Sequence, residues 1–70
     1  MPIAVAPTNV CVRVTKILAD DKTKKHLESL GITLGSPIVV LAASGGGVIC
    51  KVKDGRLALD KDMAMKIFVA

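Results

Sequence analysis

Two cysteines and one histidine are the residues of this sequence whose chemistry best suits a metal ion. Cys11 and Cys50 lie far apart in the chain, with His26 between them. A zinc site takes three or four such ligands, usually grouped in closely spaced pairs. Because these three residues show no paired spacing, we predict no metal site. We expect His26 on the surface and both cysteines as reduced thiols, either small core residues or thiols on a strand surface.

A run of three glycines, Gly45 to Gly47, invites comparison with phosphate-binding loops. A P-loop needs the pattern GxxxxGK[ST] at the start of a helix, but Lys51 is preceded by Cys50 and followed by Val52. The dinucleotide-binding pattern fails too, because Cys50 stands where the third glycine belongs. We therefore predict a hairpin turn at these glycines, with no bound nucleotide or other cofactor.

The sequence offers no arrangement of residues suited to catalysis. With His26 as the one histidine, no Ser/His/Asp set can be argued from the sequence, and Asp60 and Asp62 are placed as residues that begin a helix rather than as a paired acid and base. The sequence therefore predicts a binding or interaction module that has no catalytic residues and is not an enzyme.

Composition narrows the class of partner. The chain has 70 residues, of which 51% are hydrophobic, and a net charge of +4. A chain of this length forms one domain with a small core. Phe68 is the only aromatic residue, which excludes base stacking on single-stranded nucleic acid and aromatic grooves for proline-rich peptides. The excess positive charge is too dispersed for a typical nucleic-acid footprint, because it lies on Arg13, Lys16, Lys51, Lys53 and Arg56.

The first residues do not resemble a targeting signal. Met1 to Pro7 has no basic start and is interrupted by proline, and no apolar run reaches the length of a membrane span. The sequence therefore predicts a cytoplasmic protein without membrane insertion. We expect residues 1–9 to form an extended lead-in and residues 10–70 to form the single domain.

The first half of that domain predicts a bent strand followed by a helix. Val10, Val12 and Val14 alternate on one face, and a bulge or a sharp bend near Thr15 and Lys16 would return Ile17 to the core. Asp20 or Asp21 can cap a helix over residues 22–30 whose apolar stripe contains Leu27 and Leu30. Gly31 is suited to end the helix, and Gly35 to turn the chain into the next strand.

The next segment predicts a hairpin with strands near residues 38–43 and 48–53, turned at Gly45 and Gly46. That turn pairs Ser44 with Gly47, and continued pairing sets Leu41 opposite Cys50 and Val39 opposite Val52 on a core face. The opposite face would then carry an apolar and basic set that we predict to bind an acidic partner or a second copy of the chain. The predicted binding residues on this face are Ile38, Val40, Ile49, Lys51 and Lys53. The competing interpretation is that another element of the fold covers this face.

The rest of the chain completes a small barrel. A turn at Asp54 and Gly55 leads to a strand with Leu57 and Leu59 facing inward. Asp60 can cap one helical turn, and residues 67–69 form a closing strand. The predicted fold is mainly β, a small partly open barrel of about five strands with one inserted helix and a short C-terminal helical turn. Its structural turns are placed at Gly31, Gly35, Gly45, Gly46 and Gly55.

One ordered set of residues resembles the FeoA family. It comprises Leu27-x-x-Leu30-Gly31-Ile32-x-x-Gly35, a glycine-turned hairpin, Leu57-Ala58-Leu59 and Ala64-x-x-Ile67-x-Val69. FeoA proteins are small cytosolic accessory proteins of bacterial ferrous-iron uptake. The resemblance implies an SH3-like barrel that acts on the cytosolic GTP-binding part of the transporter FeoB, without catalytic residues. The same barrel forms the C-terminal domain of iron-dependent repressors of the DtxR type.

Two hypotheses follow. The first is a transport accessory protein that binds another protein. The second is a small nucleic-acid-binding or regulatory barrel, which the basic charge supports and the missing aromatic residues oppose. Only the second predicts a steep loss of DNA or RNA binding with rising salt.

Overall fold

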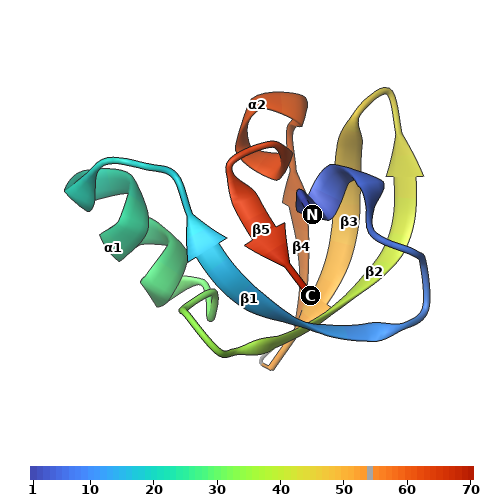
Figure 1. Ribbon diagram of the computed structural model, residues 1–70, viewed down its shortest axis with the longest axis horizontal. Helices are drawn as coiled ribbons and strands as arrows, with labels where there is room; N and C mark the ends of the chain where they lie inside the picture. Colours follow the sequence, from blue (N-terminus) through green and yellow to red (C-terminus); the bar gives the residue numbers. More distant parts are fainter. Residues whose placement is uncertain (54) are drawn as a thin grey trace.

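The computed structural model describes residues 1–53 and 55–70. Five strands form one antiparallel sheet in the order β4-β3-β2-β1-β5, with β4 and β5 at its edges (Figure 1). The predicted mainly β fold of about five strands, with an inserted helix and a short C-terminal helical turn, is confirmed, and the sheet remains open. The strands are β1 (Cys11–Ile17), β2 (Pro37–Ser44), β3 (Gly47–Val52), β4 (Gly55–Leu59) and β5 (Ile67–Val69).

Strand β1 bends where the sequence predicts. Val12 and Val14 are buried, whereas Arg13 between them is exposed. The pairing of β1 with β5 shifts register between Val14 and Lys16, which confirms the bulge. The extra residue allows Ile17 to pack against the core. Val10, expected on the same inward face, is instead 48% exposed because it precedes the strand.

Helix α1 (Asp21–Ser29) begins at a side-chain cap. The Asp20 carboxylate accepts a hydrogen bond of 2.8 Å from the backbone N–H of Thr23. This hydrogen bond lowers the pKa of Asp20. Leu27 is the buried residue of the helix, and its carbonyl accepts from the N–H of Ile32 at 2.9 Å. The helix is thus attached to the sheet by its last turn.

Gly31 ends α1 with a φ of +93°, where an L-residue is strained. A Cβ at this position would lie 3.7 Å from Val52 Cγ2, an ordinary contact, so the cost of Gly31→Ala is in the backbone. We expect this variant to lower the free energy of unfolding by about 1 kcal/mol, measured by urea denaturation followed by circular dichroism. Gly31→Asn should lose less, because asparagine tolerates this conformation better. Unchanged stability for Gly31→Ala would contradict this assignment.

The β2–β3 hairpin departs from its predicted register. Ser44 pairs with Gly47 as expected, but the register shifts between Val40 and Ala42. Because Leu41 is the extra residue, Val40 lies opposite Cys50 and Val39 opposite Lys51. The predicted pairs of Leu41 with Cys50 and of Val39 with Val52 are therefore wrong.

The bulge at Leu41 decides which side of β2 faces the core. Beyond a one-residue insertion, every side chain of a strand points to the other face. Ile38 and Val40 are consequently 1% and 0% exposed, and they pack with Cys50 and Val52 in the core. The prediction that Ile38 and Val40 face outward is wrong.

The C-terminal elements follow the sequence closely. Leu59 is buried, and Leu57 packs against the core. Helix α2 (Lys61–Ala64) is capped by Asp60, whose carboxylate accepts from the N–H of Met63 at 2.8 Å. In the predicted turn before β4, Asp54 lies outside the described residues, while Gly55 has a φ of +144°. The other glycines predicted at turns also have positive φ, namely Gly31, Gly35, Gly45 and Gly46.

The first residues belong to the domain rather than preceding it. Ile3–Val5 forms a 3-10 helix (η1), and Ile3 is fully buried in the core. The N–H of Val69 donates to the carbonyl of Met1 at 2.8 Å, so the N-terminus lies along β5 (Figure 1). The expectation of an extended lead-in over residues 1–9 is wrong at residues 3–5. Burying the Ile3 side chain in the core stabilises the folded chain. Within the described residues, we find no helix that is both long and apolar enough to span a bilayer.

Candidate binding groove

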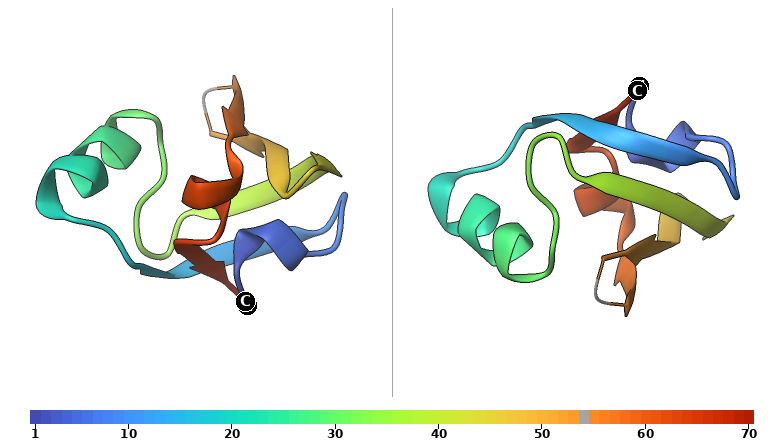
Figure 2. Two further views of the ribbon diagram at one scale, coloured as in Figure 1. Left: turned by 90° about the horizontal axis from the view of Figure 1, so that it is seen from above. Right: turned by 90° about the horizontal axis from the view of Figure 1, so that it is seen from below.

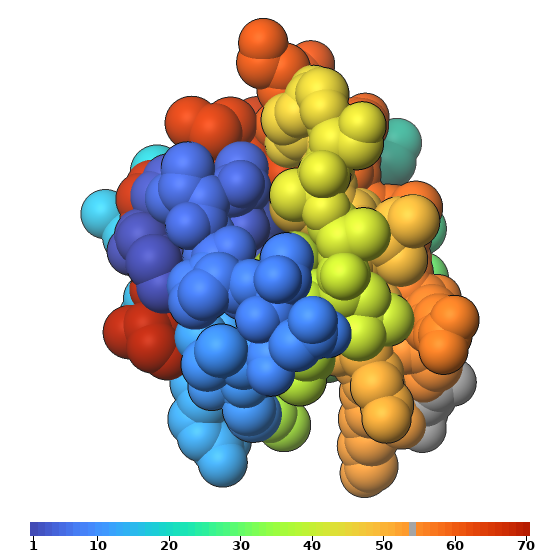
Figure 3. Space-filling model, turned by 90° about the vertical axis from the view of Figure 1, so that its right-hand side faces the viewer, coloured from blue at the N-terminus to red at the C-terminus, as the bar shows by residue number. Residues whose placement is uncertain are grey.

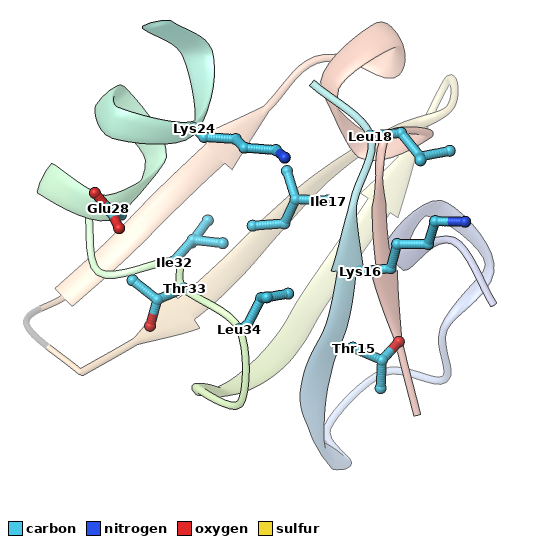
Figure 4. Close-up of a pocket in the computed structure, with 9 residues that line it drawn as sticks. All are labelled: Thr15, Lys16, Ile17, Leu18, Lys24, Glu28, Ile32, Thr33 and Leu34. Carbon is cyan, nitrogen blue, oxygen red and sulfur yellow. The ribbon is translucent and has the colours of Figure 1, made fainter. Parts of the chain in front are cut away.

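A groove lies between α1, the end of β1 and the segment that connects α1 to β2 (Figure 4). Its volume is about 450 Å³, which is in the range of sites that take a ligand or a side chain of a partner. The lining residues come from three separate stretches of the sequence, and they are Thr15, Lys16, Ile17, Leu18, Lys24, Glu28, Ile32, Thr33 and Leu34.

The interior of the groove is apolar. Ile32 is fully buried and Ile17 is half-buried, and both point into the space between α1 and β1 (Figure 4). Leu34 also points toward this space and is 68% exposed, the largest exposure among the large hydrophobic residues described. A leucine this exposed stabilises any complex that covers it, at about 25 cal/mol for each Å² of apolar surface removed from water. The interior of the groove can therefore bury an apolar side chain of a ligand or partner.

Charged side chains border this apolar interior. Lys24 and Glu28 stand one helical turn apart on α1, and Lys24 reaches across the opening toward Ile17 (Figure 4). Lys16 and Leu18 extend from the other side of β1, away from the opening. Apolar contact at the centre and charges of both signs at the border are typical of a protein-binding site. The lining set contains no histidine and no cysteine.

Leu34 was not among the residues predicted to bind a partner. The signal for it is present in the sequence, since a leucine in a short turn ending at Gly35 has no strand or helix to bury it. Of the five residues predicted as a partner-binding surface, Ile49 is 47% exposed, and Lys51 and Lys53 are exposed. Because Ile38 and Val40 are core residues, the five do not form one surface. Partner binding at the other three stays a prediction.

The metal-binding candidates lie in different environments. Cys50 is fully buried, its thiol donates to the carbonyl of Leu57 at 3.5 Å, and burial raises its pKa. Cys11 is exposed on β1, and His26 is exposed on α1. Across residues 1–53 and 55–70, no three His, Cys, Asp or Glu side chains come together as a possible metal site.

Comparison with known proteins now gives this fold a family. The model of the FeoA domain matches residues 1–70. The chain is 37% identical over 68 residues to "Putative Fe(2+) transport protein A" of Methanocaldococcus jannaschii, covering 97% of this chain and 83% of that protein. It also resembles the crystal structure of an "Iron Uptake Regulatory Protein (FeoA)", with a TM-score of 0.88, 28% identity, and coverage of 99% of this chain and 93% of that one.

A repressor shares the same fold. The "Manganese-dependent transcriptional repressor" superposes with a TM-score of 0.87 at 23% identity, over 100% of this chain and 40% of the repressor chain. At this identity the likeness concerns the fold alone. The family match over the full length and the 37% identity to an Fe²⁺ transport protein carry more weight, and they confirm the resemblance noted in the sequence. This chain belongs to the FeoA domain family.

Proposed function

We propose that this protein is a non-catalytic, cytoplasmic accessory protein of ferrous-iron uptake that binds the cytosolic GTP-binding part of a FeoB-type transporter. The family and the named Fe²⁺ transport relative support the process. The observation that carries the binding role is the groove, in which the 68% exposed Leu34 stands beside Ile17 and Ile32.

The groove supports binding rather than chemistry for two reasons. Its apolar interior gains free energy when a partner covers it, and its rim of Lys24 and Glu28 can pair with charges on that partner. In this proposal, an apolar side chain of the transporter domain enters the groove against Leu34. The free energy of that contact is concentrated in few residues, as is usual at protein interfaces.

The test is a binding measurement with the purified GTP-binding domain of the transporter from the same organism. Leu34→Asp should weaken binding at least about tenfold, because a carboxylate would be desolvated at the centre of the contact. The matched control is Met65→Asp, which changes a hydrophobic side chain that is 49% exposed beside α2. Melting temperatures of both variants should stay close to that of the parent protein. Equal affinity for the two variants would reject the groove as the binding site.

The alternative is a small nucleic-acid-binding or regulatory barrel. The observation in its favour is the fold shared with the transcriptional repressor. Against it, Phe68, the only aromatic residue, lies half-buried in β5. Binding to DNA or RNA that falls steeply between low and moderate salt would favour this alternative over the transporter.

A further inference from the structure

Basic side chains of the sheet are aligned on one face. In the row that crosses four strands, Arg56 lies opposite Lys51, Lys51 opposite Val39, and Val39 opposite Cys11. Side chains alternate along a strand, so residues two positions away in β1, β3 and β4 share the same face. We call this surface the outer sheet face, and its members are Cys11, Arg13, Val39, Ile49, Lys51, Arg56 and Ala58.

The strands that form the outer sheet face are adjacent in two views. Figure 2 (right) and Figure 3 show β1, β2 and the β3–β4 hairpin following one another across the molecule. All the members are exposed except Val39, which is half-buried. None of them lines the groove beside α1. The Arg13 guanidinium donates to the carbonyl of Gly35, next to Leu34, at 2.9 Å.

The positive charge of the protein is concentrated on this sheet. Between residues 20 and 28, three acids balance three lysines, and between residues 60 and 66 two acids balance two lysines. None of the five strands contains an acidic residue. The remaining cations are on strands, except Lys53, which follows β3 directly. The remaining acid, Asp54, lies outside the described residues. The helices are thus neutral, and the sheet carries the excess.

The outer sheet face is broad and lacks a site for a single anion. Ile49, 47% exposed, lies between Ala42 and Ala58 on the neighbouring strands. The hollow beside these residues, about 250 Å³, is lined mostly by apolar side chains and by no cation. The cations therefore match a diffuse negative surface rather than one bound phosphate.

We propose that the outer sheet face docks on an anionic phospholipid surface. Lys51, Arg56 and Arg13 contact the headgroups, and Ile49 enters the boundary between headgroups and acyl chains. Juxtamembrane cations contribute about fivefold each to binding at such a surface. Three cations on one face, with one exposed apolar residue, give the weak, reversible attachment of a peripheral protein.

The outer sheet face fits an anionic lipid surface better than it fits a protein or DNA. A protein interface concentrates its free energy in pockets and aromatic or arginine anchors at its centre, whereas here Lys51 and Val39 occupy the centre of the row. A DNA-binding protein typically makes about 6–10 phosphate contacts, more than this face can supply. A lipid surface needs neither a pocket nor many fixed contacts.

Vesicle sedimentation tests the proposal without the transporter. The full chain is mixed with phosphatidylcholine vesicles that contain or lack phosphatidylserine, at low and moderate salt. We expect binding only to the anionic vesicles, and weaker binding at the higher salt. A polarity-sensitive probe on the exposed Cys11 should report the contact, because the fully buried Cys50 is shielded from labelling.

Charge reversal locates the contact. Lys51→Glu with Arg56→Glu should reduce binding to anionic vesicles about tenfold or more. The matched control, Lys22→Glu with Lys25→Glu, makes the same change in net charge on the exposed face of α1. Equal loss in both double variants, or equal binding to neutral vesicles, would overturn the proposal. The proposal would also be overturned if the protein bound duplex DNA more tightly than anionic vesicles. The same holds if the Lys51→Glu, Arg56→Glu variant lost binding to the transporter domain while the parent protein did not bind vesicles.

This inference can fail independently of the proposed function. Leu34→Asp changes only the groove and should leave vesicle binding unaltered, whereas the double variant of Lys51 and Arg56 should leave the groove intact. If Leu34→Asp loses only transporter binding and the double variant loses only vesicle binding, the groove and the outer sheet face are two separate binding surfaces.

Discussion

Val40→Lys should unfold the protein, whereas Ile49→Lys should leave it folded. Val40 is 0% exposed at the bulged part of β2, and Ile49 is 47% exposed on β3. Lysine at position 40 would place an unpaired ammonium group in the core, at a cost of several kcal/mol. A domain of this size has a total stability of about 4–10 kcal/mol, so most of it would be lost.

The measurement is circular dichroism with thermal denaturation, because the chain has no tryptophan or tyrosine for fluorescence. Ile49→Lys should change the free energy of unfolding by no more than about 0.5 kcal/mol. Val40→Ala serves as an intermediate control, since it creates a cavity without introducing a charge. A folded Val40→Lys protein would mean that the register of the hairpin is the one without a bulge. An unfolded Ile49→Lys protein would mean that the outward face of β3 is buried, which contradicts the exposure of Ile49.

Leu27→Ala should lower the free energy of unfolding by about 2–5 kcal/mol, the range for removing a buried leucine side chain. Leu27 is 1% exposed and is the buried residue of α1, whose other side chains are half-buried or exposed. The attachment of α1 to the sheet therefore depends on this side chain. Since α1 forms one wall of the groove, the variant should also bind the transporter domain more weakly.

Hydrogen exchange separates this local effect from global unfolding. In Leu27→Ala, amides of α1 should exchange faster than those of β2 and β3. The matched control is Leu30→Ala, which truncates a half-buried leucine at the end of the same helix and should cost less. Equal destabilisation by the two substitutions would show that Leu27 is not the main anchor of α1.

Several elements could be predicted from the sequence because their signals are local. Asp20 and Asp60 cap helices through hydrogen bonds that reach only three residues along the chain. Gly31 ends α1 because the chain adopts a positive φ at this position, which glycine tolerates better than other residues. Ile17 breaks the alternation of β1, which predicted a bulge or a sharp bend near Thr15 and Lys16, and the register shift between Val14 and Lys16 is that bulge.

The register of β2 was decided by tertiary structure alone. Residues 38–43 are all apolar, so either face satisfies the hydrophobic pattern, and no local rule places the extra residue at Leu41. The packing of Ile38 and Val40 in the core fixes the extra residue at Leu41. For this reason neither residue lies on the predicted binding surface.

The groove and the position of the N-terminus also depend on tertiary structure, because each is formed by segments that are distant in the sequence. Ile17, Lys24 and Leu34 come from separate segments, and Ile3 reaches the core only because β5 offers an edge to the first residues. The sequence by itself determined the family, the caps of α1 and α2 and the glycine that ends α1, because these depend on neighbouring residues or on an ordered set of motifs. Only the folded chain decided which apolar residues face outward, because burial depends on contacts between segments that are distant in the sequence.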